Sequence, residues 1–534
     1  MGMRHEGYDY AVIGAGAAGC VMAARLAGAG ARVALIEAGG PDRDPLIGVP
    51  GANVVTGTAP GLNWNYQTEP VPALDGRDLY WAQGRVLGGS GSINGMMYLR
   101  GQPADFDHWR DLGNPGWGYA EALAAFRRAE TNERGASDLH GGDGPLQVSE
   151  GVATAPICDL FLEAAAAAGH GVTDDLNRPS EDAFGHCDMT LRRGRRSSPA
   201  TAYLRPARAA GGITVLTGAT AARLILRAGR ATGVLVRGKD GPREIAVERE
   251  VIVSAGAVNS PALLMRSGLG PAADLRGLGI AVAADLPGVG ANLQNHPCYK
   301  LMFACSAPVT AYVHVRPVGA ARAGLDYLIR RGGPLARGLF PTAGIFRTGA
   351  GDHGLAQVCL APALVIRRKP GVLGILPRRH GFTLLVNQGI PRSTGRVRLV
   401  SADPEAWPAI HPDYFGDPRD MDDLAAAVAH LREMVLDGPL ARVIEAELQP
   451  AAAPATPAEL VADIRATATT HFHAVGTCRM GPDEAAVVGP DLRVRGVEGL
   501  RVVDASVMPR IINGNTFAAT VMVAERAAAM MLGE

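Results

Sequence analysis

Two histidines near the C-terminal end carry the side chains best suited to chemistry in this sequence. His471 and His473 flank Phe472 in the segment HFHAVGTCRMG at 471–481. Residues two apart in an extended segment face the same side, and imidazole titrates near neutral pH. His473 therefore fits a general base that takes a proton from a hydroxyl group, although a structural histidine fits the same pattern. No neighbouring Asp, Glu or Cys stands at ligand spacing, so we predict no metal site.

A dinucleotide-binding pattern lies at the opposite end of the chain, in residues 8–40. An apolar strand, a G-x-G-x-x-G turn, a small-residue helix and a second apolar strand follow one another, with glycines at Gly14, Gly16 and Gly19. Such a turn lets the backbone approach a pyrophosphate, and the helix N-terminus offers N–H donors to it. Glu37 ends the second strand, where a carboxylate accepts hydrogen bonds from a ribose 2′-OH and repels the 2′-phosphate of NADP. The pattern does not distinguish between FAD and NAD as the bound dinucleotide.

Three other segments resemble loops that approach a ligand closely. Residues 84–96, GRVLGGSGSINGM, contain five glycines and two serines, which favour neither a helix nor a central strand. Residues 254–261, SAGAVNSP, follow an apolar strand and open a helix, as phosphate-binding loops do. The strand 500–504 ends in Asp504, ahead of a polar turn. A plain linker or an ordinary strand-to-helix connection would give the two glycine-rich patterns as well.

Composition limits the classes of function. Among 534 residues, 52 are Lys or Arg and 52 are Asp or Glu. This balance gives no support to a nucleic-acid or anionic-membrane partner, although a local basic patch is compatible with it. The length exceeds what one hydrophobic core supports, so two domains are expected. The seven cysteines contain no C-x-x-C pair, which indicates a reducing compartment, and we predict a cytoplasmic protein. No apolar run reaches about 18 residues, so no transmembrane helix is expected.

The ordered set of motifs resembles the glucose–methanol–choline (GMC) oxidoreductases, a family of FAD-dependent alcohol oxidases and dehydrogenases. The resemblance covers nearly the whole chain, with an N-terminal half at about 8–298 and a C-terminal half at about 392–526. Four blocks carry it in the family's order, and two lesser blocks agree with it: 14–37, 84–101, 254–271, and 473–481 with 504–515, then 63–70 and 288–297.

The resemblance implies an FAD site and an active site beside it. FAD would be bound non-covalently, because Ile93 stands where some members carry the histidine that is attached to the flavin. His473 would be the catalytic base and Asn515 the second catalytic residue. The substrate would meet His471, Phe472 and Phe517. The residues implied at the cofactor are Gly14, Gly16, Ala17, Ala18, Gly19, Glu37, Ala38, Val86, Gly89, Ser90, Asn94, Gly95, Ala222, Ala255, Gly256, Asp504, Ala505, Asn515 and Thr516.

The implied reaction is the oxidation of a primary or secondary alcohol to an aldehyde or ketone. His473 would take the hydroxyl proton and flavin N5 the hydride, and O₂ or another electron acceptor would reoxidise the flavin. Relatives with a non-redox reaction, hydroxynitrile lyases and a light-driven fatty-acid decarboxylase, imply the alternative. The sequence indicates neither the alcohol, nor the choice between oxidase and dehydrogenase, nor the oligomeric state.

The implied architecture is α/β. A Rossmann-like FAD-binding domain would come from residues 5–155, 205–298 and 485–534. An α+β substrate-binding domain with an antiparallel sheet would come from 156–204 and 299–484. Within that second domain, a helix with strong apolar spacing is predicted over 421–436. No element can be assigned over 301–386, because the apolar residues there follow no clear period.

Overall fold

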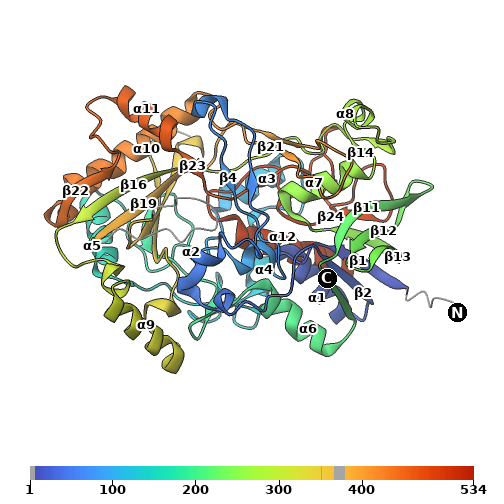
Figure 1. Cartoon of the computed structure of the whole chain (residues 1–534), viewed down its shortest axis with the longest axis horizontal. Helices are drawn as coiled ribbons and strands as arrows, with labels where there is room; N and C mark the ends of the chain where they lie inside the picture. Colours follow the sequence, from blue (N-terminus) through green and yellow to red (C-terminus); the bar gives the residue numbers. More distant parts are fainter. Residues whose placement is uncertain (1–6, 350–351, 366–378) are drawn as a thin grey trace.

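Two seven-stranded sheets form the framework of the molecule. The structure is a computed structural model that describes residues 7–349, 352–365 and 379–534. The predicted FAD-binding domain therefore begins, at residue 5, outside the described residues. Figure 1 shows the two sheets side by side along the longest axis, with the N-terminal strands in one and β16 and β19 in the other. This confirms the predicted α/β fold with a second, antiparallel sheet.

The first sheet contains the dinucleotide-binding pattern. Its strand order is β10-β2-β1-β13-β12-β11, with β24 beside β13. Strands β10, β2, β1, β24 and the end of β13 run parallel, and β11 and β12 add an antiparallel extension. The parallel strands are apolar because the sheet is covered on both faces. The strands are β1 (Tyr8–Ile13), β2 (Val33–Glu37), β10 (Ile213–Thr217), β11 (Thr220–Arg227), β12 (Arg230–Gly238), β13 (Gly241–Val253) and β24 (Leu500–Val502).

The second sheet is antiparallel throughout. Its order is β22-β16-β19-β18-β17-β7, and the short β23 pairs with β16. Strand β19 is buried along its whole length, because β16 and β18 flank it and α10 packs against it. The strands are β7 (Ala183–His186), β16 (Pro297–Cys305), β17 (Thr342–Arg347), β18 (Leu355–Ala361), β19 (Gly381–Gln388), β22 (Ile444–Gln449) and β23 (Thr469–Thr470).

Helices cover both sheets. On the first, α1 (Ala17–Gly28) packs against α12 (Thr516–Leu532), and α12 against α4 (Tyr119–Ala129). Around the second lie α5 (Pro156–Ala167), α10 (Arg419–Leu436) and α11 (Pro457–Thr467), while α9 (Pro317–Arg330) projects from the body (Figure 1). The predicted helix over 421–436 is thus α10. The shorter helices are α2 (Asn53–Thr56), α3 (Pro103–Asp111), α6 (Arg205–Ala210), α7 (Gly256–Arg266) and α8 (Ala272–Gly277).

Small two-stranded sheets complete the fold, and each sits in a connection between larger elements. They are β3 (Tyr66–Gln67) with β4 (Tyr80–Trp81), β5 (Glu130–Asn132) with β6 (Leu146–Val148), β8 (Leu191–Arg192) with β9 (Arg195–Arg196), β14 (Leu269–Gly270) with β15 (Ala284–Asp285), and β20 (Arg396–Arg398) with β21 (Ala409–His411).

Each large sheet has its own hydrophobic core. The first core surrounds β1, β2 and the end of β13, and the second surrounds β16, β18 and β19. The second core also takes in Tyr66, Trp81 and Val258, which come from segments that the sequence assigns to the FAD-binding domain. The two halves are therefore packed together through these side chains. The domain limits stay a prediction.

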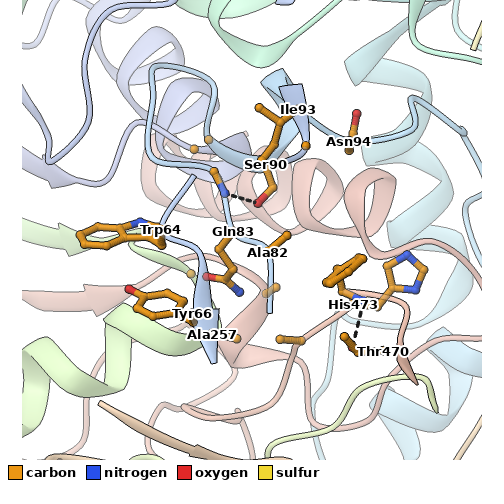
Figure 2. A pocket seen from close by; sticks show the side chains of 18 of the residues that line it. Trp64, Tyr66, Ala82, Gln83, Ser90, Ile93, Asn94, Ala257, Thr470 and His473 are labelled. Atoms are coloured by element: carbon orange, nitrogen blue, oxygen red, sulfur yellow. Dashed lines mark hydrogen bonds between the residues drawn. The ribbon is translucent and has the colours of Figure 1, made fainter. Parts of the chain in front are cut away.

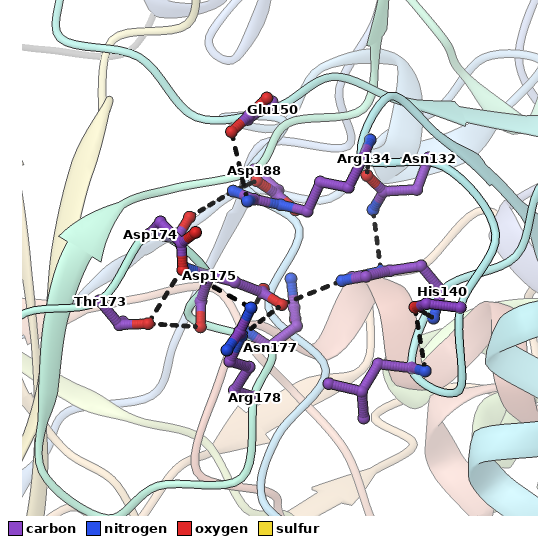
Figure 3. Close-up of polar contacts among 12 residues, drawn as sticks. Asn132, Arg134, His140, Glu150, Thr173, Asp174, Asp175, Asn177, Arg178 and Asp188 are labelled. Atoms are coloured by element: carbon purple, nitrogen blue, oxygen red, sulfur yellow. Dashed lines mark hydrogen bonds and ion pairs between the residues drawn. The ribbon is translucent and has the colours of Figure 1, made fainter.

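A buried polar network holds the chain that follows the 84–96 loop. His140 contacts Glu130 through Nδ1 at 2.9 Å. Its Nε2 contacts Asp175 at 3.0 Å (Figure 3). Glu130 also pairs with Arg100 at 2.5 Å, and Asn177 Oδ1 accepts a hydrogen bond from the Arg100 backbone N–H at 3.1 Å. Burial alone would lower the pKa of His140, but the two carboxylates raise it to about 9. The imidazolium therefore lies between two carboxylates at neutral pH, and the network fixes the position of Arg100.

Candidate functional site

A cavity of about 880 Å³ is lined by residues of both halves of the molecule. Figure 2 shows Ser90, Asn94 and His473 around this space. Most of the predicted site residues line it: Gly14, Gly16, Ala17, Ala18, Glu37, Ala38, Gly89, Ser90, Asn94, Gly95, Ala255, Gly256, His471, Phe472, His473, Asp504, Ala505, Asn515, Thr516 and Phe517. The structure thus brings together segments that lie up to 500 residues apart.

Three predicted cofactor residues lie behind the cavity wall. Gly19, Val86 and Ala222 do not line the cavity, whereas the stretch 219–221 does. A Cβ on Gly19 would collide with the Gly14 carbonyl oxygen, so this glycine serves the packing of α1 against the loop. Val86 is completely buried, and Ala222 is nearly so. Ala222 therefore lies next to the lining stretch 219–221 rather than within it.

The glycine loops form a cradle that fits the pyrophosphate of FAD. Gly14 adopts φ +97°, a conformation that favours glycine, and this turns the chain from β1 into α1. A Cβ on Gly16 would meet nothing within 4 Å, so the space beside this residue is open to a ligand. The 84–96 loop touches the first loop there, since a Cβ on Gly89 would lie 2.7 Å from Gly16 Cα. Backbone N–H groups at the start of α1 border this opening, as a diphosphate requires.

Glu37 stands at the edge of the same cradle, at the end of β2. Its Oε2 accepts the Ala15 N–H and its Oε1 the Gly39 N–H, both at 2.8 Å. Burial raises the pKa of Glu37, and the two backbone N–H groups oppose that rise. The carboxylate therefore both binds the loop backbone and faces the cavity, where a ribose hydroxyl would meet it.

Asp504 closes the cavity on the side of α7. Its Oδ2 accepts the Gly256 N–H at 2.8 Å and the Ser260 hydroxyl at 2.5 Å, and its Oδ1 accepts the Ser506 N–H at 2.8 Å. One carboxylate thus joins the start of α7 to the segment after β24. The helix expected after the 254–261 segment is α7, and it begins within that segment, at Gly256.

A third histidine, His296, meets His473 inside the protein. The segment 294–298 runs antiparallel to 469–475, and this pairing places the two side chains together. His296 Nδ1 lies 2.9 Å from His473 Nδ1, and the ring planes are perpendicular. Asn295 Oδ1 accepts the backbone N–H groups of both His296 and His473, at 2.9 and 2.7 Å. The backbone around both imidazoles is therefore fixed.

The hydrogen bonds of His296 determine the tautomer of His473. His296 Nε2 lies 2.8 Å from the Gly389 carbonyl oxygen, so we assign the proton of a neutral His296 to Nε2. Its Nδ1 is then an acceptor, and the contact at 2.9 Å requires His473 Nδ1 to be the donor. His473 Nε2 consequently carries a lone pair. That nitrogen is the one beside Asn515, at the cavity.

Asn515 orients its amide toward the same nitrogen. Its Nδ2 lies 3.1 Å from His473 Nε2, and its Oδ1 accepts a hydrogen bond from Gln357 Nε2 at 3.1 Å. Asn515 precedes the first turn of α12, which positions the residue at the end of a long buried helix. Gln357 comes from β18 in the other half of the molecule, so both halves contribute to this arrangement.

His471 lies beside His473 but is bound elsewhere. The two ring centroids are 4.6 Å apart, which agrees with the expected same-side arrangement. The segment is not extended, however, because Phe472 adopts φ +64°. His471 Nδ1 contacts Asn387 Oδ1 of β19 at 2.9 Å. Phe472 stacks edge-on against Tyr80, with ring centroids 6.2 Å apart.

Burial keeps all three imidazoles neutral. It lowers the pKa of His296 to about 4 and that of His471 to about 3. Burial, with the neighbouring rings of His471 and His296, lowers the pKa of His473 well below its usual range. A neutral imidazole is the form that can accept a proton. Within the part of the chain that the structure describes, no group of His, Cys, Asp or Glu is arranged to hold a metal ion.

Sequence reasoning missed His296, Gln357 and Asn387. His296 belongs to the block 288–297, whose resemblance to the family was recognised without a role for this residue. Gln357 and Asn387 lie within the region 301–386 and just after it, where no strand was assigned. Both are completely buried polar residues of buried strands, and a polar residue within an apolar strand is the signal that could have indicated them.

Comparisons with known proteins show the family of this chain. Two models described as GMC oxidoreductase match residues 8–298 and 391–524. A mitochondrial choline dehydrogenase of Mus musculus is 41% identical, over 98% of this chain and 89% of the relative. An alcohol dehydrogenase (acceptor) of Pseudomonas putida is 38% identical, over 98% and 96%. A solved structure of Aspergillus oryzae formate oxidase, determined to study its FAD modification, has a TM-score of 0.92 at 25% identity and covers 100% of this chain and 99% of its own.

Proposed function

Because this chain belongs to the GMC oxidoreductase family, we propose that it oxidises a primary or secondary alcohol to an aldehyde or ketone, with His473 as the base. The family makes the protein an FAD-dependent oxidoreductase that acts on CH–OH groups. When bound, FAD supplies the acceptor for the hydride, at flavin N5. The residues that would hold it are those of the cradle, chiefly the loops at 14–19 and 84–96, Glu37 and Asp504.

The observation that carries the proposal is the lone pair on His473 Nε2 at the cavity. A hydroxyl group that enters the cavity there can give its proton to Nε2. The resulting imidazolium is unfavourable in so buried a position, but the developing alkoxide beside it compensates the charge. Gln357 Nε2 donates to Asn515 Oδ1 at 3.1 Å and so fixes the amide, whose second Nδ2–H is available to donate to the same oxygen. The proton thus leaves as the carbon becomes able to release its hydride.

The lining of the cavity favours an uncharged alcohol. Aromatic and aliphatic side chains line much of it, among them Phe472, Phe517 and Leu385. Among the described residues, the carboxylates of the lining are Glu37, Asp78 and Asp504. Glu37 and Asp504 bind loop backbone, and Asp78 is exposed. No buried carboxylate of the described lining is therefore left to pair with a cationic substrate, so we propose a neutral alcohol ahead of a quaternary ammonium alcohol.

Two further assignments belong to the proposal. Ile93 lines the cavity and offers no nucleophile, which supports non-covalent FAD. All seven cysteines are free and buried, which supports the cytoplasm as the compartment. The expected acceptor for electrons from the reduced cofactor is O₂ or another electron acceptor. Steady-state rates with O₂ and with a dye acceptor would separate an oxidase from a dehydrogenase.

The experiment is anaerobic reduction of the holoenzyme by a panel of alcohols. The panel contains aliphatic and aromatic primary alcohols, secondary alcohols, and choline as the cationic member. We expect the neutral alcohols to bleach the flavin absorbance, and choline to do so more slowly. If no alcohol bleaches the flavin while cyanohydrin cleavage or illuminated fatty-acid decarboxylation proceeds, the proposal is wrong. Fast bleaching by choline alone would contradict the preference for a neutral substrate.

A further inference from the structure

Helix α9 leaves an apolar row uncovered. Figure 1 shows the helix projecting from the body beside the second sheet. Val318, Leu325, Leu328 and Ile329 are 67%, 59%, 72% and 70% exposed. Isolated exposed apolar residues are common, but four large ones on one helix are not. This row requires an explanation other than chance exposure.

The row points away from the protein. At about 100° per residue, Val318, Leu325 and Ile329 share one side of the helix. Ala323 and Tyr327 occupy the opposite side and are the buried residues of α9. The Tyr327 hydroxyl donates to the Gly48 carbonyl at 3.2 Å and anchors the helix to the loop at 45–52. The large apolar residues of α9 therefore face outward, and Ala323 and Tyr327 pack against the protein.

Arginines surround the apolar row. The segment 311–337 contains one acidic residue, Asp326, and five arginines: Arg316, Arg322, Arg330, Arg331 and Arg337. The net charge of zero for the whole chain hides this local excess. A helix with an apolar face and basic flanks is the pattern of helices that lie in the interface of an anionic bilayer.

A basic cavity adjoins helix α9. Its volume is about 1070 Å³, and its lining contains seven arginines against three aspartates. Within the described residues, Arg43, Arg192 and Arg195 of this lining form no ion pair. The cavity includes Gly48, the residue that α9 contacts through Tyr327, and the β8–β9 turn at Gly194 packs against the backbone of Arg331. The basic cavity thus borders α9 on its packed side, beside Tyr327, while the apolar row lies on the outer side of the same helix.

We propose that α9 and the adjoining basic cavity form a docking surface for an anionic lipid bilayer. The apolar row of α9 enters the bilayer interface, and the arginines meet lipid phosphate groups. The described part of the chain contains no helix with the length and hydrophobicity needed to cross a bilayer, so the contact is peripheral. Leu339 and Phe340, which follow α9 and line the FAD cavity, then lie close to the membrane side of the protein. The proposal does not depend on the substrate of the enzyme.

Co-sedimentation of the holoenzyme with vesicles tests the proposal. Vesicles of phosphatidylcholine alone are compared with vesicles that contain about one third phosphatidylglycerol. We expect binding to the anionic vesicles, and a loss of most of it at about 1 M salt, where the Debye length falls to about 3 Å. Leu325→Glu with Ile329→Glu should lower the partition coefficient at least about tenfold. Arg192→Glu with Arg195→Glu should weaken binding to anionic vesicles without affecting the neutral ones.

The matched control is Val400→Glu, which alters an equally exposed apolar residue in a loop away from α9 and should bind as the wild type does. FAD content and melting temperature show that each variant is folded. Two outcomes overturn the proposal. In one, the wild type stays in the supernatant with both vesicles. In the other, sedimentation without lipid shows a dimer that Leu325→Glu dissociates, because a second copy of the chain then covers the row.

Discussion

His296 Nδ1 lies 2.9 Å from His473 Nδ1, so one buried imidazole orients another. The Gly389 carbonyl sets the tautomer of His296, and His296 in turn sets that of His473. The chain of hydrogen bonds ends at Nε2 of His473, beside Asn515. The base therefore requires no charged partner, because two neutral hydrogen bonds define its proton acceptor site at the wall of the cavity.

Replacement of His296 should slow the reaction without removing the cofactor. In His296→Ala, the Nδ1–H of His473 has no acceptor and the ring is free to adopt the other tautomer. We expect flavin reduction by a good alcohol to slow about 10- to 100-fold, in line with the loss of one buried hydrogen bond. His296→Asn keeps a carbonyl acceptor and should recover part of the rate. Stopped-flow reduction under anaerobic conditions measures both.

The control for that variant is His353→Ala. His353 Nδ1 also contacts a backbone carbonyl, that of Ile390 at 2.7 Å, but the residue does not line the cavity. A positioning role also predicts that His296→Ala changes the pH profile of flavin reduction, whereas damage to folding would not. An unchanged rate and pH profile would remove His296 from the mechanism.

His473 and His471 should differ sharply when each is replaced. His473→Ala removes the base and should slow flavin reduction by about 10²- to 10⁴-fold while FAD stays bound. His471→Ala should cost less than about tenfold, because its Nδ1 is directed to Asn387 rather than to Asn515. Stopped-flow measurement of flavin reduction at saturating alcohol gives the rate of each variant and tests this difference. An equal loss in both would show that His471 also takes part in proton transfer.

The three buried imidazoles should make the protein sensitive to acid. An unfolded histidine takes up a proton near pH 6.5, whereas the pKa values of His296 and His471 fall to about 4 and about 3 in the folded protein. The unfolded state therefore binds more protons below pH 6.5, and stability decreases as the pH falls. At pH 5 each such histidine costs about 2 kcal/mol. Melting temperatures of the holoenzyme at pH 7 and pH 5 measure the effect.

The comparison variant for acid sensitivity is His471→Asn, which keeps a polar side chain but cannot be protonated. Its melting temperature should fall less between pH 7 and pH 5 than that of the wild type. Equal falls would mean that other groups dominate the acid response. His140, whose pKa rises to about 9 in the folded protein, opposes this fall because it binds more protons in the folded than in the unfolded state between pH 7 and pH 5, and its contribution is the same in both proteins.

Local pattern predicted the first half of the fold well and the second poorly. The βαβ unit of β1, α1 and β2 and the helix α10 follow from apolar periodicity and glycine spacing, which act within a few turns of chain. The strands β16 to β19 were missed because they form the centre of a sheet that is covered on both faces. Their apolar residues therefore show no alternation, and Gln357 and Asn387 interrupt them for reasons that lie in the active site.

The sequence indicated the residues of the candidate site but not the hydrogen bonds that orient them. Residue spacing and the family resemblance indicated His473 and Asn515. In the structure, Asn515 Nδ2 lies 3.1 Å from His473 Nε2. The tautomer could not be predicted, because it depends on His296 and the Gly389 carbonyl, far away in the sequence. The surface of α9 was missed because this helix lies within 301–386, where no element was assigned, and only the fold shows which side of it faces outward.

Glu37 should control the affinity for FAD. Both of its carboxylate oxygens accept backbone N–H groups, those of Ala15 and Gly39. In Glu37→Gln one acceptor becomes an amide that faces an N–H donor, so the loop at 14–16 must move, and the ribose loses its anionic acceptor. We expect the dissociation constant for FAD to rise about tenfold or more, the cost of one to two buried hydrogen bonds. Fluorescence titration of the apoprotein with FAD measures it, with Glu248→Gln, an exposed glutamate, as the control. Full FAD occupancy with an unchanged dissociation constant would show that the loop holds the nucleotide without Glu37.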